Sequence, residues 1–152
     1  MTDLHFAQDQ AGAEHIRSLL LACDATFFPA LSTRISIEDY AAKLAVHAVR
    51  TEAWYGTRLV ALVATYCNAP DRETAFISNV SVDPEFRRRG IAKQLVCRVV
   101  RVAEDLGFRF LALEVDRRAQ GAIGLYTGLG FALAKETDMT IAMTKELKGR
   151  ER

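Results

Sequence analysis

The most informative segment of this chain is Val82-Asp83-Pro84-Glu85-Phe86-Arg87-Arg88-Arg89-Gly90-Ile91-Ala92. An apolar run ends at Val82, a turn containing proline follows, and three arginines and a glycine open a helical pattern. The free amide N–H groups of a helix start, the helix dipole and arginine side chains all favour an anion. Gly90 has no side chain, so a ligand can come close to the main chain there. The segment therefore predicts a compact anion site suited to a pyrophosphate.

The arginine cluster has two other interpretations. Three arginines can also form a merely solvated turn, and charge alone does not separate the two cases. A nucleic-acid patch is disfavoured, because no aromatic residues are interleaved and the net charge of the chain is only +1. The glycine pattern of a dinucleotide-binding loop is absent, and so is the Gly-Lys-Ser/Thr of a P-loop.

The segments that flank the arginine cluster predict a strand–helix–strand unit. A strand is expected over 75–82, a helix from Gly90 to Leu106 that stops at Gly107, and a second strand over 110–115. A helix between two strands makes them parallel, with a right-handed crossover. The second strand is a near-continuous apolar run, which is expected of a strand buried on both faces.

The rest of the chain completes a mixed α/β sandwich with antiparallel pairs at its start and end. Gly56-Thr57-Arg58 between two apolar segments is a hairpin signal. Ser36 followed by Asp39 resembles a capping box that opens a helix. The further expected helices span 11–23, 36–48 and 119–129, and the further strands span 4–6, 52–55, 59–66, 131–134 and 139–144.

Composition is that of one soluble globular domain covering residues 1–152. Half of the 152 residues are apolar and 26% are charged, and no apolar run approaches the roughly 20 residues of a membrane helix. The first residues lack a signal-peptide pattern, so we expect a cytoplasmic protein. The three cysteines, Cys23, Cys67 and Cys97, have no zinc spacing and are expected to be buried thiols, and no metal is expected.

Two motifs resemble those of the GCN5-related N-acetyltransferase (GNAT) family. They are Arg87-x-x-Gly90-x-Ala92 after a strand ending at Val82, and Leu125-Tyr126 followed by Gly130-Phe131, in the family's order. The resemblance covers residues 75–131 strongly and the first 70 residues only as element order. It implies a GNAT-type mixed, mostly antiparallel sheet, with a central parallel strand pair splayed around acyl-CoA and helices on both faces.

The resemblance also implies where acetyl-CoA would bind. The pantetheine arm would pair with the main chain of Val80 and Val82 like an added strand. The pyrophosphate would lie on the cluster that comprises Arg87, Arg88, Arg89, Gly90, Ile91 and Ala92. Two departures matter: relatives often carry asparagine at the position of Ala119, and Phe76 and Asn79 lie in the region where some histone-type members have a glutamate base.

Tyr126 is the candidate general acid. The departing CoA thiolate needs a proton, and a phenol with an ordinary pKa of ~10 stays protonated at neutral pH and can supply one. The alternative is a helix tyrosine that only packs on the sheet.

Glu114 is the candidate base for the incoming amine. It lies in the apolar strand 110–115, where burial would make its carboxyl a stronger base. It also precedes Tyr126 by twelve positions, as the proposed base does in ribosomal-protein N-terminal acetyltransferases, which this segment resembles. Two alternatives stay open: a structural carboxylate paired with Arg50 or Arg109, or a water held by Ser78, Asn79 and Ser81.

The expected activity is direct transfer of an acetyl group to the primary amine of a small molecule, such as an amino sugar, amino acid or polyamine. Alternatives are a protein N-terminal or lysine acetyltransferase, and a non-catalytic acyl-CoA-binding domain. No nucleic acid or membrane partner is expected, and a homodimer is compatible with the sequence. The resemblance implies an acceptor beside the connection of the first two helices, residues 27–34, with Tyr40 and Trp54; the alternative is that these aromatic residues belong to the core.

Overall fold

The computed structural model describes residues 4–27 and 30–148. In this part of the chain seven strands form one sheet, in the order β1-β2-β3-β4-β5-β7-β6. The strands are β1 (Leu4–Gln8), β2 (Val49–Tyr55), β3 (Arg58–Tyr66), β4 (Thr74–Val82), β5 (Phe110–Asp116), β6 (Ala132–Glu136) and β7 (Thr140–Glu146). The helices are α1 (Ala13–Cys23), α2 (Ile37–His47), α3 (Ile91–Asp105) and α4 (Gln120–Gly128), with short 3-10 turns η1 (Asp24–Thr26), η2 (Leu31–Thr33) and η3 (Pro84–Phe86).

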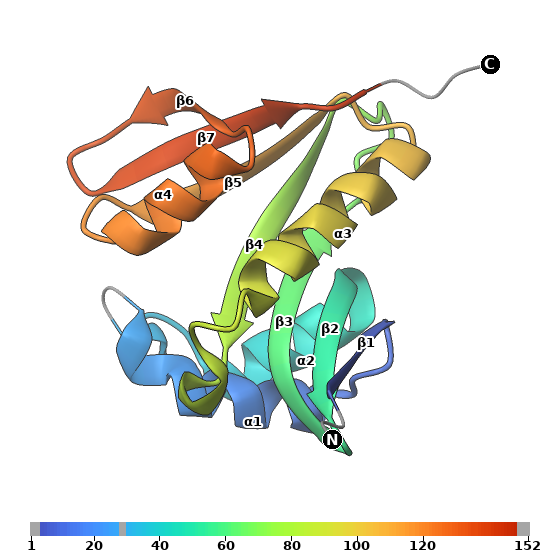
Figure 1. Ribbon diagram of the computed structural model, residues 1–152, viewed down its shortest axis with the longest axis vertical. Helices are drawn as coiled ribbons and strands as arrows, with labels where there is room; N and C mark the ends of the chain where they lie inside the picture. The colour runs from blue at the N-terminus through green and yellow to red at the C-terminus, as the bar shows by residue number, and fades with distance from the viewer. Residues whose placement is uncertain (1–3, 28–29, 149–152) are drawn as a thin grey trace.

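The sheet is antiparallel except for its central pair, β4 and β5. Helix α3 connects these two strands, as expected for a parallel pair, which needs a crossover. Figure 1 shows β5 and β7 running away from β4 toward the upper left, while β1, β2 and β3 stay beside it. The predicted mixed sheet with a splayed central pair is therefore confirmed.

Helices cover both faces of the sheet (Figure 1). Helices α3 and α4 lie on one face, where their apolar side chains share a core with β4 and β5. Helices α1 and α2 lie on the other face, against β2 and β3. We call these the α3 face and the α2 face.

One prediction about β5 is wrong: the strand is buried on one face only. Leu111 and Leu113 are buried beneath α3 and α4. Ala112 is half-buried and Glu114 is exposed, because these alternate residues point to the α2 face, and none of the helices in residues 4–27 and 30–148 covers that face over this half of the sheet.

The helices begin and end where their sequences indicate. Ser36 accepts the N–H of Asp39 at 3.2 Å, which caps α2. Along α3, Leu95, Val99 and other apolar residues at helical spacing are buried. Gly107 follows this helix with a φ of 88°, a conformation that glycine adopts readily.

A buried charged pair, which the sequence did not indicate, ties the first helices to β2. Glu52 is fully buried and accepts the N–H groups of Gln10 and Ala11 and the indole N–H of Trp54. Arg50 Nε lies 3.6 Å from a Glu52 oxygen, and its Nη1 donates to carbonyls at the end of α2. Trp54 is thus a core residue, which is the second of the two roles expected for it.

The cysteines differ in their surroundings: Cys23 is buried, Cys67 is half-buried and Cys97 is exposed, so the expectation of three buried thiols is wrong for Cys97. Within residues 4–27 and 30–148, no helix has the length and apolar character to cross a membrane. Over the same residues, no group of three or more His, Cys, Asp or Glu side chains is arranged to hold a metal ion.

Candidate active site

The splay between β4 and β5 creates a wedge in the middle of the sheet. The two strands pair only over Thr74–Ile77 and Phe110–Leu113. Beyond this seam β4 continues to Val82 and β5 to Asp116, each paired only with its other neighbour. The strand edges that face the wedge therefore offer main-chain groups to an extended ligand.

Val80 and Val82 lie on the wedge edge of β4, as predicted. The N–H of Asp83 donates to the Val60 carbonyl of β3 at 2.8 Å. Alternate residues of an antiparallel strand form hydrogen bonds to opposite sides. The main-chain groups of Val80 and Val82 therefore face the wedge. The carbonyl of Val82 already accepts Cys23 Sγ at 3.3 Å and Arg87 Nε at 3.4 Å. Val80 is therefore the better-placed partner for a pantetheine amide.

The predicted anion site forms a loop between β4 and α3. Asp83 caps η3, and the loop then passes through Arg88 and Gly90, whose φ angles are 64° and 73°. Gly90 is the N-cap of α3, so no side chain caps the helix, and its first amides have no intrahelical acceptor. A Cβ at Gly90 would meet no atom within 4 Å, which leaves room for a ligand. Ile91 is buried and Ala92 half-buried, so these two residues offer their amides and not their side chains.

The three arginines of this loop have different surroundings. Arg87 reaches back to the Val82 carbonyl, and Arg89 stacks 4.9 Å over the ring of Phe86. Arg88 is exposed. The loop thus keeps three positive charges at the start of α3, each with part of its side chain in solvent.

Tyr126 of α4 is buried on the α3 face, with 6% of its surface exposed. Its ring packs edge-to-face on Phe131 at 5.9 Å, in the same apolar cluster as Val80 and Val82. Burial raises the pKa of the Tyr126 phenol to about 12. The hydroxyl therefore keeps its proton at every physiological pH, as a proton donor requires.

Glu114 is exposed, so its expected burial is wrong. It points to the α2 face of β5, while Tyr126 approaches from the α3 face. Neither arginine that was considered as its structural partner pairs with it: Arg50 pairs with Glu52 and Asp9, and Arg109 pairs with Glu73. The two candidate catalytic groups thus lie on opposite sides of the sheet, with the wedge between them.

A bulge in β4 lies where the wedge opens. Ala64 pairs with Asn79 and Thr65 pairs with Ile77, so Ser78 is an extra residue with no partner on β3. The hydroxyl of Tyr40 on α2 lies 2.5 Å from Ser78 Oγ and 3.2 Å from its carbonyl oxygen.

Asn79 and Ser81, beyond the bulge, are buried and joined by a 2.5 Å hydrogen bond from Ser81 Oγ to Asn79 Oδ1. These side chains, with Ser78, are the three that were predicted to hold a relay water, and they are adjacent. Phe28 and Pro29, expected near the acceptor, lie outside the described residues, and Phe27 is half-buried in the α1–α2 core.

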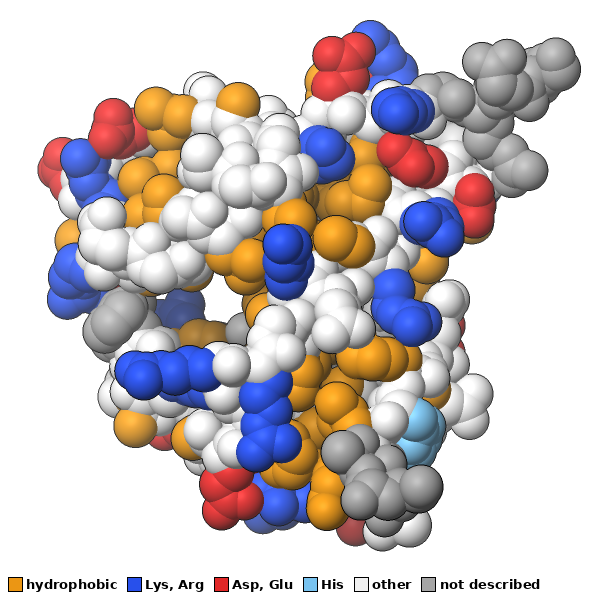
Figure 2. Space-filling view, in the orientation of Figure 1, with side chains coloured by type: hydrophobic (Ala, Val, Ile, Leu, Met, Phe, Trp, Pro, Cys, Tyr) orange, Lys and Arg blue, Asp and Glu red, His pale blue; other side chains and the backbone are white. Residues whose placement is uncertain are grey.

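Figure 2 shows the surface of the α3 face hollowed between the half formed by α4 and β5–β7 and the half below it. A separate cavity of about 390 Å³ lies away from the wedge, between α1 and the β2–β3 hairpin, and is lined in part by Glu14, His15 and Arg58. It adjoins the anion loop only through Asp83, whose carboxylate is already paired with Arg58 at 2.5 Å.

A mixed sheet opened at its centre, with an anion loop at one end and a buried phenol beside it, is the architecture of an acyl-CoA-dependent acyltransferase. Comparison with known proteins agrees: residues 9–131 match the acetyltransferase (GNAT) family, and the chain belongs to it. The family and the fold predicted from the two motifs are therefore confirmed.

Individual relatives differ in their stated roles. An uncharacterized N-acetyltransferase of Methanocaldococcus jannaschii is 35% identical over 92 residues, or 58% of this chain and 41% of the relative. The [Ribosomal protein bS18]-alanine N-acetyltransferase of Salmonella typhimurium is 39% identical over 59 residues, or 39% of this chain and 40% of the relative. The chain thus spans about two-fifths of the length of each. The PaiA N-acetyltransferase of Thermoplasma acidophilum, solved with coenzyme A, has the same fold, with a TM-score of 0.74 at 15% identity over 93% of this chain and 99% of that one.

Proposed function

We propose that this chain transfers the acetyl group of acetyl-CoA directly to the primary amine of a small molecule. The observation that carries the proposal is the wedge itself. On the α3 face the wedge adjoins the anion loop, the open strand edge at Val80 and the buried phenol of Tyr126. On the α2 face it adjoins the exposed carboxylate of Glu114. Acetyl-CoA would enter from the α3 face and the amine from the α2 face.

The reaction needs two proton movements. The amine nitrogen attacks the thioester carbon and the C–S bond breaks, which releases CoA thiolate and an amide that must lose one proton. Glu114, or a water held by Ser78, Asn79 and Ser81, takes the proton from the amine. Tyr126 donates a hydrogen bond to the departing sulfur, and the proton lost by the amine finally reaches that sulfur.

The raised pKa of Tyr126 constrains how it acts. Moving a proton from a phenol of pKa about 12 to a thiolate of usual pKa ~8.5 is uphill by about 5 kcal/mol. The phenol therefore stabilises the developing thiolate chiefly as a hydrogen-bond donor. Net proton transfer follows when the proton lost by the amine reaches the phenolate or the sulfur through solvent.

A protein N-terminus is the second candidate acceptor. Glu114 is exposed on an uncovered face of β5, where an extended peptide could lie, and one relative is named as a ribosomal-protein alanine acetyltransferase. A protein lysine is less favoured, because the region of Phe76 and Asn79 lacks the glutamate that some histone-type members use as a base.

Release of free thiol from acetyl-CoA tests the proposal, with a panel of amino sugars, amino acids, polyamines and short peptides as acceptors. We expect acetyl-CoA to raise the melting temperature, since a ligand at 100 times its Kd stabilises the folded state by about 2.7 kcal/mol. We also expect amine-dependent thiol release, with the acetylated small amine identified by mass spectrometry. Stabilisation without thiol release from any amine would leave a non-catalytic acyl-CoA-binding domain. Turnover of peptides alone would establish the second candidate.

A further inference from the structure

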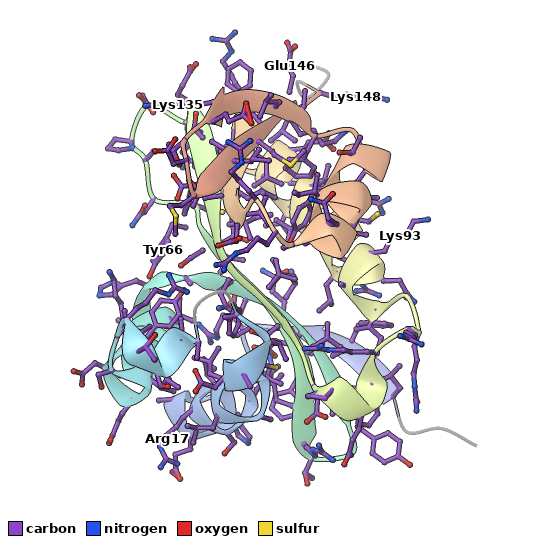
Figure 3. All side chains as sticks on the ribbon, turned by 90° about the vertical axis from the view of Figure 1, so that its left-hand side faces the viewer. Arg17, Tyr66, Lys93, Lys135, Glu146 and Lys148 are labelled. Atoms are coloured by element: carbon purple, nitrogen blue, oxygen red, sulfur yellow. The ribbon has the colours of Figure 1, made fainter. Side chains whose placement is uncertain are left out.

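The α2 face beside the wedge carries charged and aromatic side chains from several elements. Tyr66 and Phe76 are partners across β3 and β4, so their side chains share this face. Glu114 and Asp116 share it from β5, since alternate residues of a strand point to the same side. We call the surface formed by these four residues the acceptor face. Figure 3 shows Tyr66 on the side of the molecule away from Lys93 of α3.

Hydrogen-bond donors gather at one edge of the acceptor face, where β3 ends and α2 lies. The hydroxyl oxygen of Tyr66 is buried and has no hydrogen-bond partner among the described residues. Burial raises the pKa of both Tyr66 and Tyr40, so both phenols remain protonated donors. The hydroxyl of Tyr40 is already bonded to Ser78, which leaves Tyr66 as the donor without an acceptor. A buried polar group without a partner is destabilising and calls for an explanation.

Two cations flank these phenols. Lys43 of α2 has its Nζ 5.8 Å from the centre of the Tyr66 ring. Arg34, which follows η2, is exposed and forms no ion pair among the described residues. It is close enough to Tyr40 and to Asp116 that its charge acts on the pKa of each. Arg34 is thus near enough to both the donor edge and β5 for its charge to act on each.

The opposite wall is acidic. Arg118 bonds both oxygens of Asp116 at 2.9 Å, and this contact, helped by Arg34, lowers the pKa of Asp116 to about 2. Asp116 is therefore charged at every physiological pH, and Glu114 lies two residues before it on the same side. The acceptor face is thus bipolar, with donors and cations at the α2 edge and carboxylates on β5.

We propose that the acceptor is an amine that also carries an anionic group, in the manner of an amino acid, and that Arg34, Tyr66 and Lys43 bind that group. The inference rests on the proposed acetyl transfer and narrows its substrate class. The amine would face Glu114 and the wedge, and the anion would give the Tyr66 hydroxyl its acceptor. A polyamine would bring a further cation to the edge that already holds Lys43 and Arg34. An amino sugar without an anionic group would offer these two cations no partner.

Matched acceptors test this inference. We would measure kcat/KM for an amino acid, its carboxamide and its decarboxylated amine, and for the corresponding aminoalkylphosphonate. A charge-assisted hydrogen bond contributes enough that wild type should favour the acid over its amide by about 10- to 100-fold. Equal turnover of the acid and the phosphonate would mean that the edge recognises any anionic group. Preference for the acid would mean that the edge is specific for a carboxylate.

Variants connect the preference to the named residues. Arg34→Gln should lower kcat/KM for the acid by about 10-fold or more, mainly through KM, and leave the amide unchanged, while Arg34→Lys should restore part of the loss. Tyr66→Phe should raise KM for the acid and also raise the melting temperature, because it removes a buried hydroxyl without a partner. Arg17→Gln is the control, since Arg17 is exposed on α1 and far from the acceptor face (Figure 3).

The outcomes separate the inference from the proposed function. No turnover of any amine, with acetyl-CoA still bound, defeats the proposed function. Turnover in which amides, polyamines or peptides match or exceed the acid defeats the inference alone. An equal loss for acid and amide in Arg34→Gln also defeats it, because Arg34 would then act on the fold or on catalysis and not on the anion.

Discussion

Arg88 and Gly90 both adopt the left-handed backbone conformation, two residues apart, at the start of α3. This conformation is strained for a residue with a side chain, by of order 1–3 kcal/mol, and such strain gathers at ligand sites. Turns that contain left-handed residues can also direct successive amides toward one concave side, where an anion can bind. The two φ angles therefore shape the main chain of the anion loop, to which the arginine side chains add charge.

Gly90→Val should abolish the stabilisation by acetyl-CoA. The branched side chain would occupy the space beside the α3 amides and would be forced into a left-handed conformation that valine rarely adopts. Gly56→Val is the matched control, because Gly56 has a similar φ of 62° and equally open surroundings, in the β2–β3 turn. Both variants should lose stability, and only the first should lose the ligand-induced shift in melting temperature. Wild-type affinity for CoA in Gly90→Val would place the anion site elsewhere.

Tyr126→Phe should cut kcat by about 10² to 10⁴ while acetyl-CoA binding stays nearly intact, because the ring still packs on Phe131 and only the hydroxyl is lost. Since the pKa of Tyr126 is about 12, its ionisation should produce no fall in rate below about pH 11. Pre-steady-state measurement of the chemical step checks both statements. Tyr55→Phe, at an exposed tyrosine of β2, serves as the control. A wild-type chemical step in Tyr126→Phe would remove this residue from the mechanism.

Glu114→Gln should flatten the acidic limb of the pH–rate profile if Glu114 is the base, because an amide takes no proton from the incoming amine. The measurement is kcat/KM from pH 5 to 9 with the best acceptor. Glu146→Gln, at an exposed residue of β7 beside the seam, should leave the profile unchanged. An acidic limb that survives in Glu114→Gln would assign the proton to a water held by Ser78, Asn79 and Ser81.

Cys23 should make the fold sensitive to alkali. Burial raises the pKa of its thiol from 9.0 to about 11, so the native state holds the proton more tightly than the unfolded state does. The contribution of this proton to the free energy of unfolding is complete below pH 9. It is lost as the pH rises toward 11, by about 2–3 kcal/mol over the whole range. Urea unfolding between pH 8 and 10 should show a smaller decline in Cys23→Ala than in wild type. Cys97→Ala, at an exposed thiol, should keep the wild-type slope, and the same slope in all three proteins would contradict the assignment.

The sequence predicts the parts of this structure that depend on local pattern. The hairpin at Gly56, the cap at Ser36 and the parallel pair on either side of α3 all follow from spacing and turn chemistry, and the structure contains each of them. The loop between β4 and α3 follows for the same reason, because three arginines and a glycine are adjacent in the chain, and its binding of an anion stays a prediction.

Features that depend on contacts between distant segments were not predictable in this way. The apolar run around Glu114 has the same sequence pattern whether one face of β5 is covered or both. Only the placement of α3 and α4 determines which face is buried. The bulge at Ser78 depends on the register of β4 against β3, and the buried Glu52 on amides more than 40 residues away in the chain. Tyr66 gave no local signal, since its burial arises from the packing of α2 on the end of β3.

Because the seam between β4 and β5 is short, a small rotation there would change the width of the wedge. The part of β4 beyond the seam, from Ile77 to Val82, is paired with β3 and not with β5, and it is roughly 17 Å long at about 3.4 Å per residue. A rotation of about 5° at the seam would move its tip by about 1.5 Å, the length of one carbon–carbon bond. Ala75 and Leu111 pair at the seam and are fully buried, so a change in the volume of either side chain would act on that angle. The width of the wedge can therefore be tuned by residues at the seam, away from its open end.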